Sequence, residues 1–248
     1  MPRGAPRLRL PERGERGQHG EVYYVAGRAA MHIVKTMQDV GLRLAWYALV
    51  AAALGGCFPQ QAGPRLQHFD WSAPQVGAPA PLFELQAIDG TRVRLQDLLG
   101  DKPTVLQLGS HSCPVYRYRR FGMAALHEKY KDRVNFLIVY TLEAHPAGAK
   151  SPYADGEWLT WWNRFGGVRI PQSASSEARR AQARLSHEVL RIAYPMAADG
   201  MDNRVWKAYG AASSPAFVID RNGHVALRQV WLDPTGIAQA LDRLLTDQ

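Results

Sequence analysis

Apolar and polar residues alternate along residues 82–88 and again along residues 91–95. Such alternation is typical of a strand that buries one face. The dipeptide Asp89-Gly90 between the two segments is a strong signal for a tight turn. The pattern therefore predicts a β-hairpin.

A second pattern, of almost unbroken apolar runs, covers residues 104–108 and 134–140. Runs of this kind are typical of strands buried on both faces of a parallel sheet. Residues 114–130 between them have helical spacing, so the three segments predict a strand–helix–strand unit. We expect the core face of this helix to carry Val115, Tyr118, Gly122, Ala125 and Leu126.

The rest of the pattern predicts further helices and strands after one long irregular segment. Residues 141–174 are rich in Trp, Pro and Gly, and a loop of this length in a compact domain is usually functional. Periodicity then predicts a helix over 175–192, a short strand near 195–198, a helix over 202–209 capped by Asp202, a hairpin of 216–220 with 224–230, and a last helix from Asp233.

Composition and charge narrow the function classes. The chain has 248 residues, 46% of them hydrophobic, which is ordinary for a globular protein with a substantial core. Its net charge of +8 divides evenly between residues 1–57 and the rest of the chain. Acidic and basic residues are interspersed in the larger part, so we expect no nucleic-acid partner.

The N-terminal part carries a targeting pattern. The apolar run over residues 44–56 has 13 residues, which is short of the ~20 that span a membrane and typical of the core of a signal peptide. It ends in Leu54-Gly55-Gly56-Cys57, which resembles the lipobox of bacterial lipoproteins. That resemblance implies cleavage before Cys57 and a lipid on its thiol. An ordinary signal peptide cut near residues 51–53 and an uncleaved anchor are the alternatives, and all three place the domain outside the cytoplasm.

These patterns divide the chain into three parts. Residues 1–57 are expected to be a disordered extension followed by the signal or lipoprotein segment. Residues 58–81 contain five prolines and read as an extended linker. Residues 82–248 are expected to form one α/β domain with a central mixed sheet flanked by helices.

The candidate chemistry centres on Cys113, one of two cysteines in the chain. It stands between a predicted buried strand and a predicted helix, and Pro114 suits the first helical turn. At a helix start a thiol faces free N–H groups and the positive end of the helix dipole, and Arg117 adds a charge one turn on. Burial acts in the opposite direction. We expect the stabilising effects to prevail and to lower the thiol pKa below ~8.5.

The order of elements resembles the thioredoxin fold, with an N-terminal hairpin and an insertion after the second core strand. In that fold an X–Pro bond just before the third core strand is cis and lies against the reactive thiol. Ser214-Pro215 stands in the matching place. The resemblance therefore implies a cis bond at Pro215, within a few ångströms of Cys113.

Several motifs together resemble the iodothyronine deiodinase family and its bacterial deiodinase-like relatives. They cover roughly residues 100–245 and comprise Gly109-Ser110-His111-Ser112-Cys113-Pro114, Ile138-Val139-Tyr140, Glu143-Ala144-His145-Pro146, Ser151-Pro152-Tyr153, Glu157-Trp158, Trp162-Asn163, Asp199-Gly200-Met201-Asp202-Asn203 and Asp233-Pro234. The resemblance implies that Cys113 is the nucleophile, where the vertebrate enzymes carry a selenocysteine that attacks iodine. His111 stands where those enzymes have an auxiliary cysteine, and the family's proline is displaced from Pro215. These departures leave thiol redox chemistry as the expectation and deiodination open.

Other polar and aromatic residues complete the candidate site. Glu143 and His145 follow the second apolar strand, so they share an edge with Cys113, where they would shuttle a proton or anchor the loop. Ser110 and Ser112 are expected to hydrogen-bond the thiolate or to act as turn residues, and Arg117 to contact an anionic substrate or to lie solvated. Trp158, Trp161 and Trp162 are expected to pack the insertion onto the core, with Trp158 able to wall a substrate pocket. His111 is expected to be an exposed loop residue, with a proton donor near the thiol as the alternative. No set of metal ligands and no cofactor motif stands out.

These observations favour an exported thiol-dependent oxidoreductase that uses Cys113 on a small-molecule or thiol/disulfide substrate, with an external thiol as reductant and a lipid anchor in the membrane. A one-cysteine thiol peroxidase is one alternative, because Ser110 and Cys113 have the Ser-x-x-Cys spacing of peroxiredoxins. A non-catalytic binding or assembly lipoprotein that keeps the fold is the other.

Overall fold

A computed structural model describes residues 63–246. They contain one seven-stranded sheet with the order β2-β1-β5-β4-β3-β6-β7. The strands are β1 (Glu84–Ala87), β2 (Arg92–Arg94), β3 (Thr104–Gly109), β4 (Asn135–Tyr140), β5 (Met196–Ala198), β6 (Ala216–Ile219) and β7 (Val225–Gln229). Neighbours β3, β4 and β5 are parallel, whereas β1 and β6 run antiparallel to β5 and β3. The predicted mixed sheet and both hairpins are confirmed.

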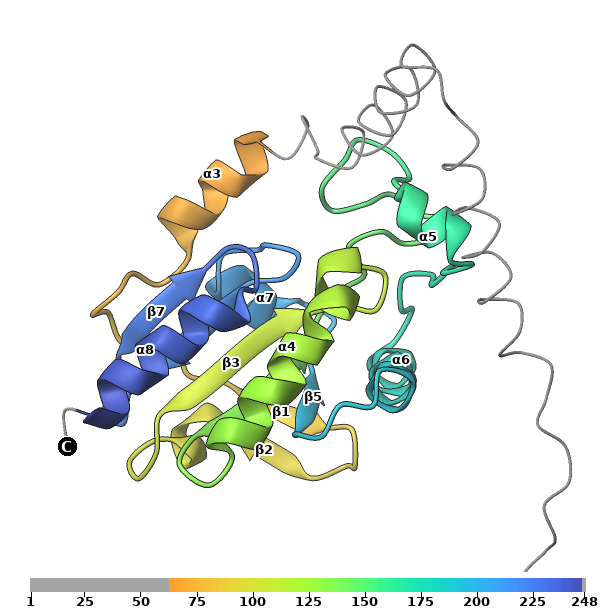
Figure 1. Ribbon diagram of the computed structural model, residues 1–248. Coiled ribbons are helices and arrows are strands. Elements are labelled where there is room, and N and C mark those ends of the chain that lie inside the picture. The colour runs from red at the N-terminus through yellow and green to blue at the C-terminus, as the bar shows by residue number, and fades with distance from the viewer. Residues whose placement is uncertain (1–62, 247–248) are drawn as a thin grey trace, which may run out of the picture. The chain divides into compact units, whose positions relative to one another are not determined.

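Helices cover both faces of this sheet (Figure 1). They are α3 (Gly63–Ser72), α4 (Pro114–Tyr130), α5 (Trp161–Phe165), α6 (Ser176–Val189), α7 (Arg204–Ala208) and α8 (Pro234–Thr246), with a 3-10 turn at Leu95–Leu98. On one face α4, α6 and α8 bury a cluster that includes Met123, Ala183 and Ile237. The other cluster includes Phe69 and Tyr209, from α3 and the end of α7. Each face of the sheet therefore has its own core, as the apolar runs predict.

The core face of α4 differs from the predicted one. The helix buries Tyr116, Met123, Leu126 and Tyr130, whereas Tyr118 is 77% exposed. The buried set is offset around the helix from the predicted stripe, because the ring of Tyr116 occupies the space beside the backbone of Gly109 at the end of β3. The prediction was wrong because it placed the exposed ring of Tyr118 on the core face.

The segment before β1 is not the extended linker that the prolines predict. Residues 63–72 form α3, and Phe69 is 2% exposed in the core beside Phe217. Gly210, at φ +88°, lets this segment approach closely, since a Cβ there would lie 2.6 Å from the Phe69 ring. The domain that the structure describes thus begins before residue 82, and the prediction of an extended linker is wrong for residues 63–72.

The predicted signal segment and Cys57 lie outside the described residues. Between residues 63 and 246, no helix is long and apolar enough to cross a membrane.

Candidate active site

Cys113 is the N-cap residue of α4, and Pro114 is the first helical residue. The apolar strand β3 ends at Gly109, and the residues after it carry the chain across the sheet edge to the helix. The Sγ atom is 3.8 Å from Oγ of Ser213, and the residue is only 1% exposed. The thiol thus lies at the carboxyl edge of the parallel strands, where α/β proteins place their ligands and chemistry.

Burial raises the pKa of the Cys113 thiol above its ordinary value. Backbone N–H groups of Tyr116 and Val115, the Ser213 hydroxyl and the charge of Arg117 act in the opposite direction, and the loss of solvation outweighs them. The predicted lowering of this pKa is therefore wrong. A helix start favours a thiolate, but full enclosure costs the charged form more than the helix and a half-buried arginine restore.

Hydrogen bonds join the Cys113 loop to the segment that follows β4. The Ser110 and Ser112 hydroxyl oxygens accept from the backbone N–H groups of Ala144 and His145, at 3.0 and 2.9 Å. Both hydroxyls thus link two segments of the chain, a role that neither of the two expected alternatives, a bond to the thiolate or a turn residue, describes. They fix the Cys113 loop against the segment that carries Glu143 and His145.

The Glu143 carboxylate is buried at the centre of this network. One oxygen accepts from the Ser112 backbone N–H at 2.7 Å, and the other accepts from the Tyr140 hydroxyl. Gln172 holds the Glu143 backbone at both its N–H and its C=O. Burial raises the pKa of this carboxyl, although the hydrogen bonds from Ser112 and Tyr140 lower it in part. Glu143 is placed as an anchor of the loop and as a group able to hold a proton.

His145 packs against the insertion. Its Nδ1 is 3.1 Å from the Trp158 backbone oxygen, and its ring meets the Trp158 ring edge-on at 4.4 Å. Because a carbonyl oxygen only accepts, the proton is assigned to Nδ1, which leaves Nε2 as an acceptor. Burial lowers the pKa of His145 to about 4, so the ring is neutral at pH 7. Trp158 is half-buried and walls His145.

Arg117 and Asn163 tie α5 to the loop. The guanidinium donates to the His111 carbonyl oxygen and, at 2.7 Å, to Oδ1 of Asn163. The Asn163 amide in turn donates to the Ser112 carbonyl oxygen at 2.7 Å and is fully buried. Arg117 is thus committed to protein acceptors, in place of the predicted anion contact or solvated position.

Three site residues had no assigned role from the sequence. Tyr140 and Asn163 stand within the family motifs, and that was the only signal for them, because an apolar strand gives no reason to assign a hydroxyl. Ser213 precedes Ser214-Pro215, and its place beside the sulfur follows only from the pairing of β6 with β3.

The predicted cis bond at Pro215 is wrong, because the described residues contain no cis peptide bond. A trans bond is the lower-energy form for most X–Pro pairs. Here the trans chain lets Pro215 accept a hydrogen bond from the Leu108 N–H at 3.0 Å, while Ser213 faces the sulfur. In the segment before β6, Ser213 is therefore the residue beside the thiol, and the Pro215 carbonyl is hydrogen-bonded to β3.

His111 is half-buried, which differs from the exposed position predicted for it. Its Nδ1 is 3.1 Å from the Ser186 hydroxyl on α6, and its backbone N–H donates to the Tyr140 hydroxyl. Burial and the nearby Arg117 charge lower its pKa to about 4.

The tryptophans of the insertion do not all pack as predicted. Trp158 is half-buried, but Trp161 is 51% exposed and Trp162 is 46% exposed. They contact each other, and Trp161 stacks on Phe165, so α5 presents these rings outward. Asn163 between them supplies the inward contact of α5.

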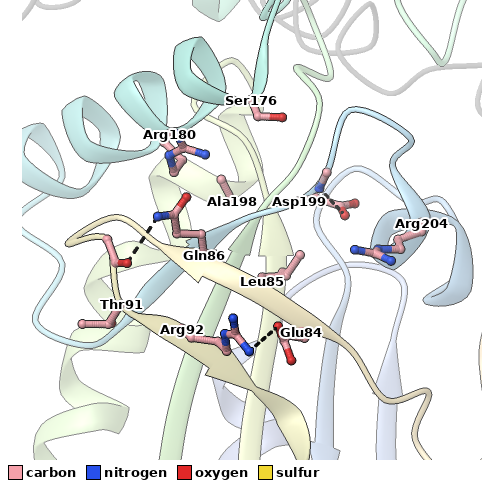
Figure 2. A pocket seen from close by; sticks show the side chains of 12 residues that line it. Glu84, Leu85, Gln86, Thr91, Arg92, Ser176, Arg180, Ala198, Asp199 and Arg204 are labelled. Atoms are coloured by element: carbon pink, nitrogen blue, oxygen red, sulfur yellow. Dashed lines mark hydrogen bonds and ion pairs between the residues drawn. The ribbon is translucent and has the colours of Figure 1, made fainter.

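A separate polar cavity of about 390 Å³ lies beside β1 and the carboxyl end of β5 (Figure 2). Its lining includes Glu84, which pairs with Arg92 at 3.2 Å, and Asp199, which accepts from three backbone N–H groups. None of the predicted site residues lines it. Within residues 63–246, no three His, Cys, Asp or Glu side chains gather closely enough to hold a metal ion.

The fold and the site define a class: a thioredoxin-like α/β protein with a buried cysteine at the start of the helix that follows β3. Solved structures support the fold. The chain superposes on an uncharacterized conserved protein from Geobacillus kaustophilus with a TM-score of 0.51 and 21% identity, covering 70% of this chain and 84% of that one. A candidate protein disulfide isomerase from Bacteroides thetaiotaomicron gives a TM-score of 0.50 and 16% identity, covering 70% and 91%. At these identities the likeness shows the fold alone.

Sequence similarity identifies the family as well as the fold. The model of the iodothyronine deiodinase family matches residues 64–228, and the chain belongs to that family. It is 33% identical over 159 residues to thyroxine 5-deiodinase of Gallus gallus, covering 63% of this chain and 56% of that one. The human enzyme of the same name is 36% identical over 162 residues, covering 63% and 48%. The chain thus spans about half the length of these curated relatives.

Proposed function

We propose that this protein is a thiol-dependent oxidoreductase in which Cys113 attacks a soft electrophilic atom of a small molecule, a halogen or a sulfur. The observation that carries the proposal is the place of Cys113: it caps α4 at the carboxyl edge of the parallel strands, in a chain of the deiodinase family. Cys113 is the only free cysteine in the described part of the chain. The second thiol that completes a turnover is therefore expected from outside.

The reaction balances with two external thiols. With an iodinated aromatic substrate, Cys113 takes the iodine and a proton takes its place on carbon, giving the dehalogenated ring and a sulfenyl iodide. One external thiol displaces iodide to form a mixed disulfide, and a second releases Cys113 as the thiol and leaves as a disulfide. A disulfide substrate enters at the mixed-disulfide stage. Sulfur is a weaker nucleophile than selenium, so we expect slow deiodination.

Glu143 and His145 are proposed to support the proton transfer. Glu143 is a buried carboxyl with a raised pKa, and His145 has an unprotonated Nε2. Groups of this kind can hold a proton and pass it to a leaving group. Ser110 and Ser112 position both residues against the Cys113 loop.

The enclosed thiol favours one second candidate, a non-catalytic binding module. Cys113 is 1% exposed and its pKa is raised, which describes an inert thiol as well as a covered reactive one. The test is a turnover screen with an iodinated phenol, a small disulfide and a peroxide, each with dithiothreitol. We expect turnover that is lost in Cys113→Ser and kept in Cys57→Ser. Turnover of peroxide alone would indicate the peroxidase, and turnover of none would favour the binding module.

We also propose export and anchoring through Cys57. The support is the 13-residue apolar run that ends at this cysteine. The intact mass of protein extracted from membranes tests it. A mature chain that begins at a lipid-modified Cys57 is expected, and an unmodified Cys57 or an uncleaved chain would contradict the proposal.

A further inference from the structure

Large aromatic side chains on α4 and α5 are exposed next to the Cys113 loop. Trp161, Trp162 and Phe165 on α5 are 51, 46 and 79% exposed, and Tyr118 and Phe121 on α4 are 77 and 65% exposed. We call these five residues the aromatic surface. Scattered exposed apolar residues are ordinary, but a contiguous group of large rings marks an interaction site. The rings of α5 pack on one another, with Trp161 and Phe165 stacked at 5.1 Å.

A hydrogen bond holds the two helices close to each other. Arg117 of α4 donates to Asn163 of α5, which fixes the helices together, and Figure 1 shows α5 near one end of α4. Phe121 follows Arg117 by four residues and Tyr118 precedes Phe121 by three. Residues at these spacings share one side of a helix. Phe121 therefore shares the side of α4 that Arg117 turns toward α5, and Tyr118 lies next to Phe121 on the flank away from Arg117.

The charge of this region has one sign. Residues 114–127 and 158–170, which contain the aromatic surface, include no Asp or Glu. They do include Arg117, Arg119, Arg120, Arg164 and Arg169. The Arg120 guanidinium lies 3.9 Å from the centre of the Phe121 ring, so cationic and aromatic groups are interleaved. The rest of the domain mixes both signs.

We propose that the aromatic surface docks on an anionic lipid bilayer. Tryptophan is enriched at the membrane–water interface, where its ring enters the headgroup region. Arginines beside it are attracted to anionic headgroups, at roughly 1 kcal/mol each near the surface. A bilayer accepts a convex cluster of rings without the complementary pocket that a protein partner would have to supply.

The length of the preceding chain is compatible with this orientation. Anchoring at Cys57, which is part of the proposed function, would leave five residues, 58–62, before α3 begins at Gly63. Five residues span roughly 17 Å at full extension. A domain on so short a tether stays at the bilayer surface.

Docking would place the reactive loop at the membrane. Asn163, which lies among the rings of α5, donates to the Ser112 carbonyl oxygen next to Cys113. The Cys113 loop and α5 are thus directly connected by a hydrogen bond. This inference deepens the proposed function, because it points to an apolar substrate drawn from the bilayer.

Hydrogen–deuterium exchange of the full chain with lipid vesicles tests the docking locally, so that binding through the N-terminal segment does not obscure it. We expect slower exchange in residues 114–121 and 161–165 with phosphatidylglycerol vesicles and little change with phosphatidylcholine. The double variant Trp161→Ser/Phe165→Ser should lose this protection. Trp71→Ser removes an 87% exposed tryptophan on α3 and should keep it. Circular dichroism verifies that each variant is folded.

Charge provides a second test. Arg119→Gln/Arg120→Gln should weaken the vesicle-dependent protection by about fivefold per charge removed. Equal protection in the wild type and the aromatic double variant, or none with either lipid, would overturn the proposal. Protection that grows with protein concentration without vesicles would assign the surface to a second copy and would also overturn it. The measurement is repeated in Cys113→Ser, so its outcome is independent of any turnover.

Discussion

At the scale of single residues, Cys113 is subject to two opposing influences. The start of α4 supplies N–H groups that favour a thiolate, and Ser213 and Arg117 add to them. The segment before β6 and the loop around Ser112, which Asn163 holds in place, enclose the thiol. This enclosure removes water and favours the neutral form of the thiol. Because enclosure prevails, the resting protein holds a protonated, covered thiol. Reaction then requires the loop or the insertion to open.

The pH dependence of Cys113 alkylation tests this balance. With iodoacetamide we expect slow modification with a midpoint above the free-thiol value of ~8.5. Arg117→Ala should raise the midpoint further, because the Arg117 charge lowers the thiol pKa. A midpoint below ~8.5 in the parent would contradict the enclosed thiol.

Asn163→Ala should speed alkylation at every pH, because it removes the bonds from α5 to Ser112 and Arg117. It leaves a buried carbonyl unpaired, at a cost of about 1–3 kcal/mol. Asn222→Ala, in an exposed turn, is the matched control and should alkylate like the parent. Equal rates in all three proteins would show that α5 does not cover the thiol.

His145 predicts acid sensitivity. Its pKa is about 4 in the folded protein against an ordinary value near 6.5, so the unfolded chain binds the proton first as pH falls. The stability that its neutral ring contributes is full above pH ~6.5 and is lost as pH falls toward about 4. Urea unfolding across this range should show a shallower loss in His145→Gln. An unchanged pH slope would mean that the ring is solvated.

At the scale of elements, α3 is part of the domain. Phe69→Ala should lower the free energy of unfolding by about 3–5 kcal/mol, because it empties a core position between α3 and β6. Trp71→Ala, at an exposed position of the same helix, should change it by less than about 0.5 kcal/mol. Urea titration measures both, and equal small effects would contradict the docked helix.

The packing of α4 on β3 is equally specific. A Cβ at Gly109 would lie 2.5 Å from the Tyr116 ring, which is fully buried and has no room to move. Gly109→Ala should therefore destabilise the fold by about 1–3 kcal/mol. Gly156→Ala, where a Cβ meets nothing within 4 Å, is the control. Thermal unfolding compares the two, and a stable Gly109→Ala protein would show that the ring adapts.

At the scale of the whole molecule, local patterns predicted most of the fold. Alternation and apolar runs located the strands, and Pro114 marked the start of α4 to the residue. They did not predict what depends on contacts between distant segments. The prolines around α3 led to the prediction of an extended linker, whereas a helix forms there and packs Phe69 on the sheet. Likewise the Asp199 carboxylate accepts from the N–H groups of Val205 and Trp206 at the start of α7. The sequence assigned the cap to Asp202, which accepts from the Arg204 N–H at 3.4 Å, and periodicity gave no reason to add Asp199.

The candidate site shows the same division. Glu143 and His145 were expected at the same edge of the sheet as Cys113, and the structure places them there. Their roles in the chemistry remain predictions. The partners of Ser110, Ser112 and Arg117 depend on how the insertion folds back, which no spacing along the chain reveals. The predicted lowering of the Cys113 pKa was wrong because the burial that raises this pKa exists only in the assembled domain.

A single-turnover burst shows whether Cys113 is the group that reacts. The full chain is mixed with an excess of iodinated phenol or disulfide without reductant, and released iodide or thiol is counted per chain. We expect at most one equivalent, renewed when dithiothreitol is added, present in Cys57→Ser and absent in Cys113→Ser. A burst of the same size in Cys113→Ser, or none in the parent with either substrate, would contradict it.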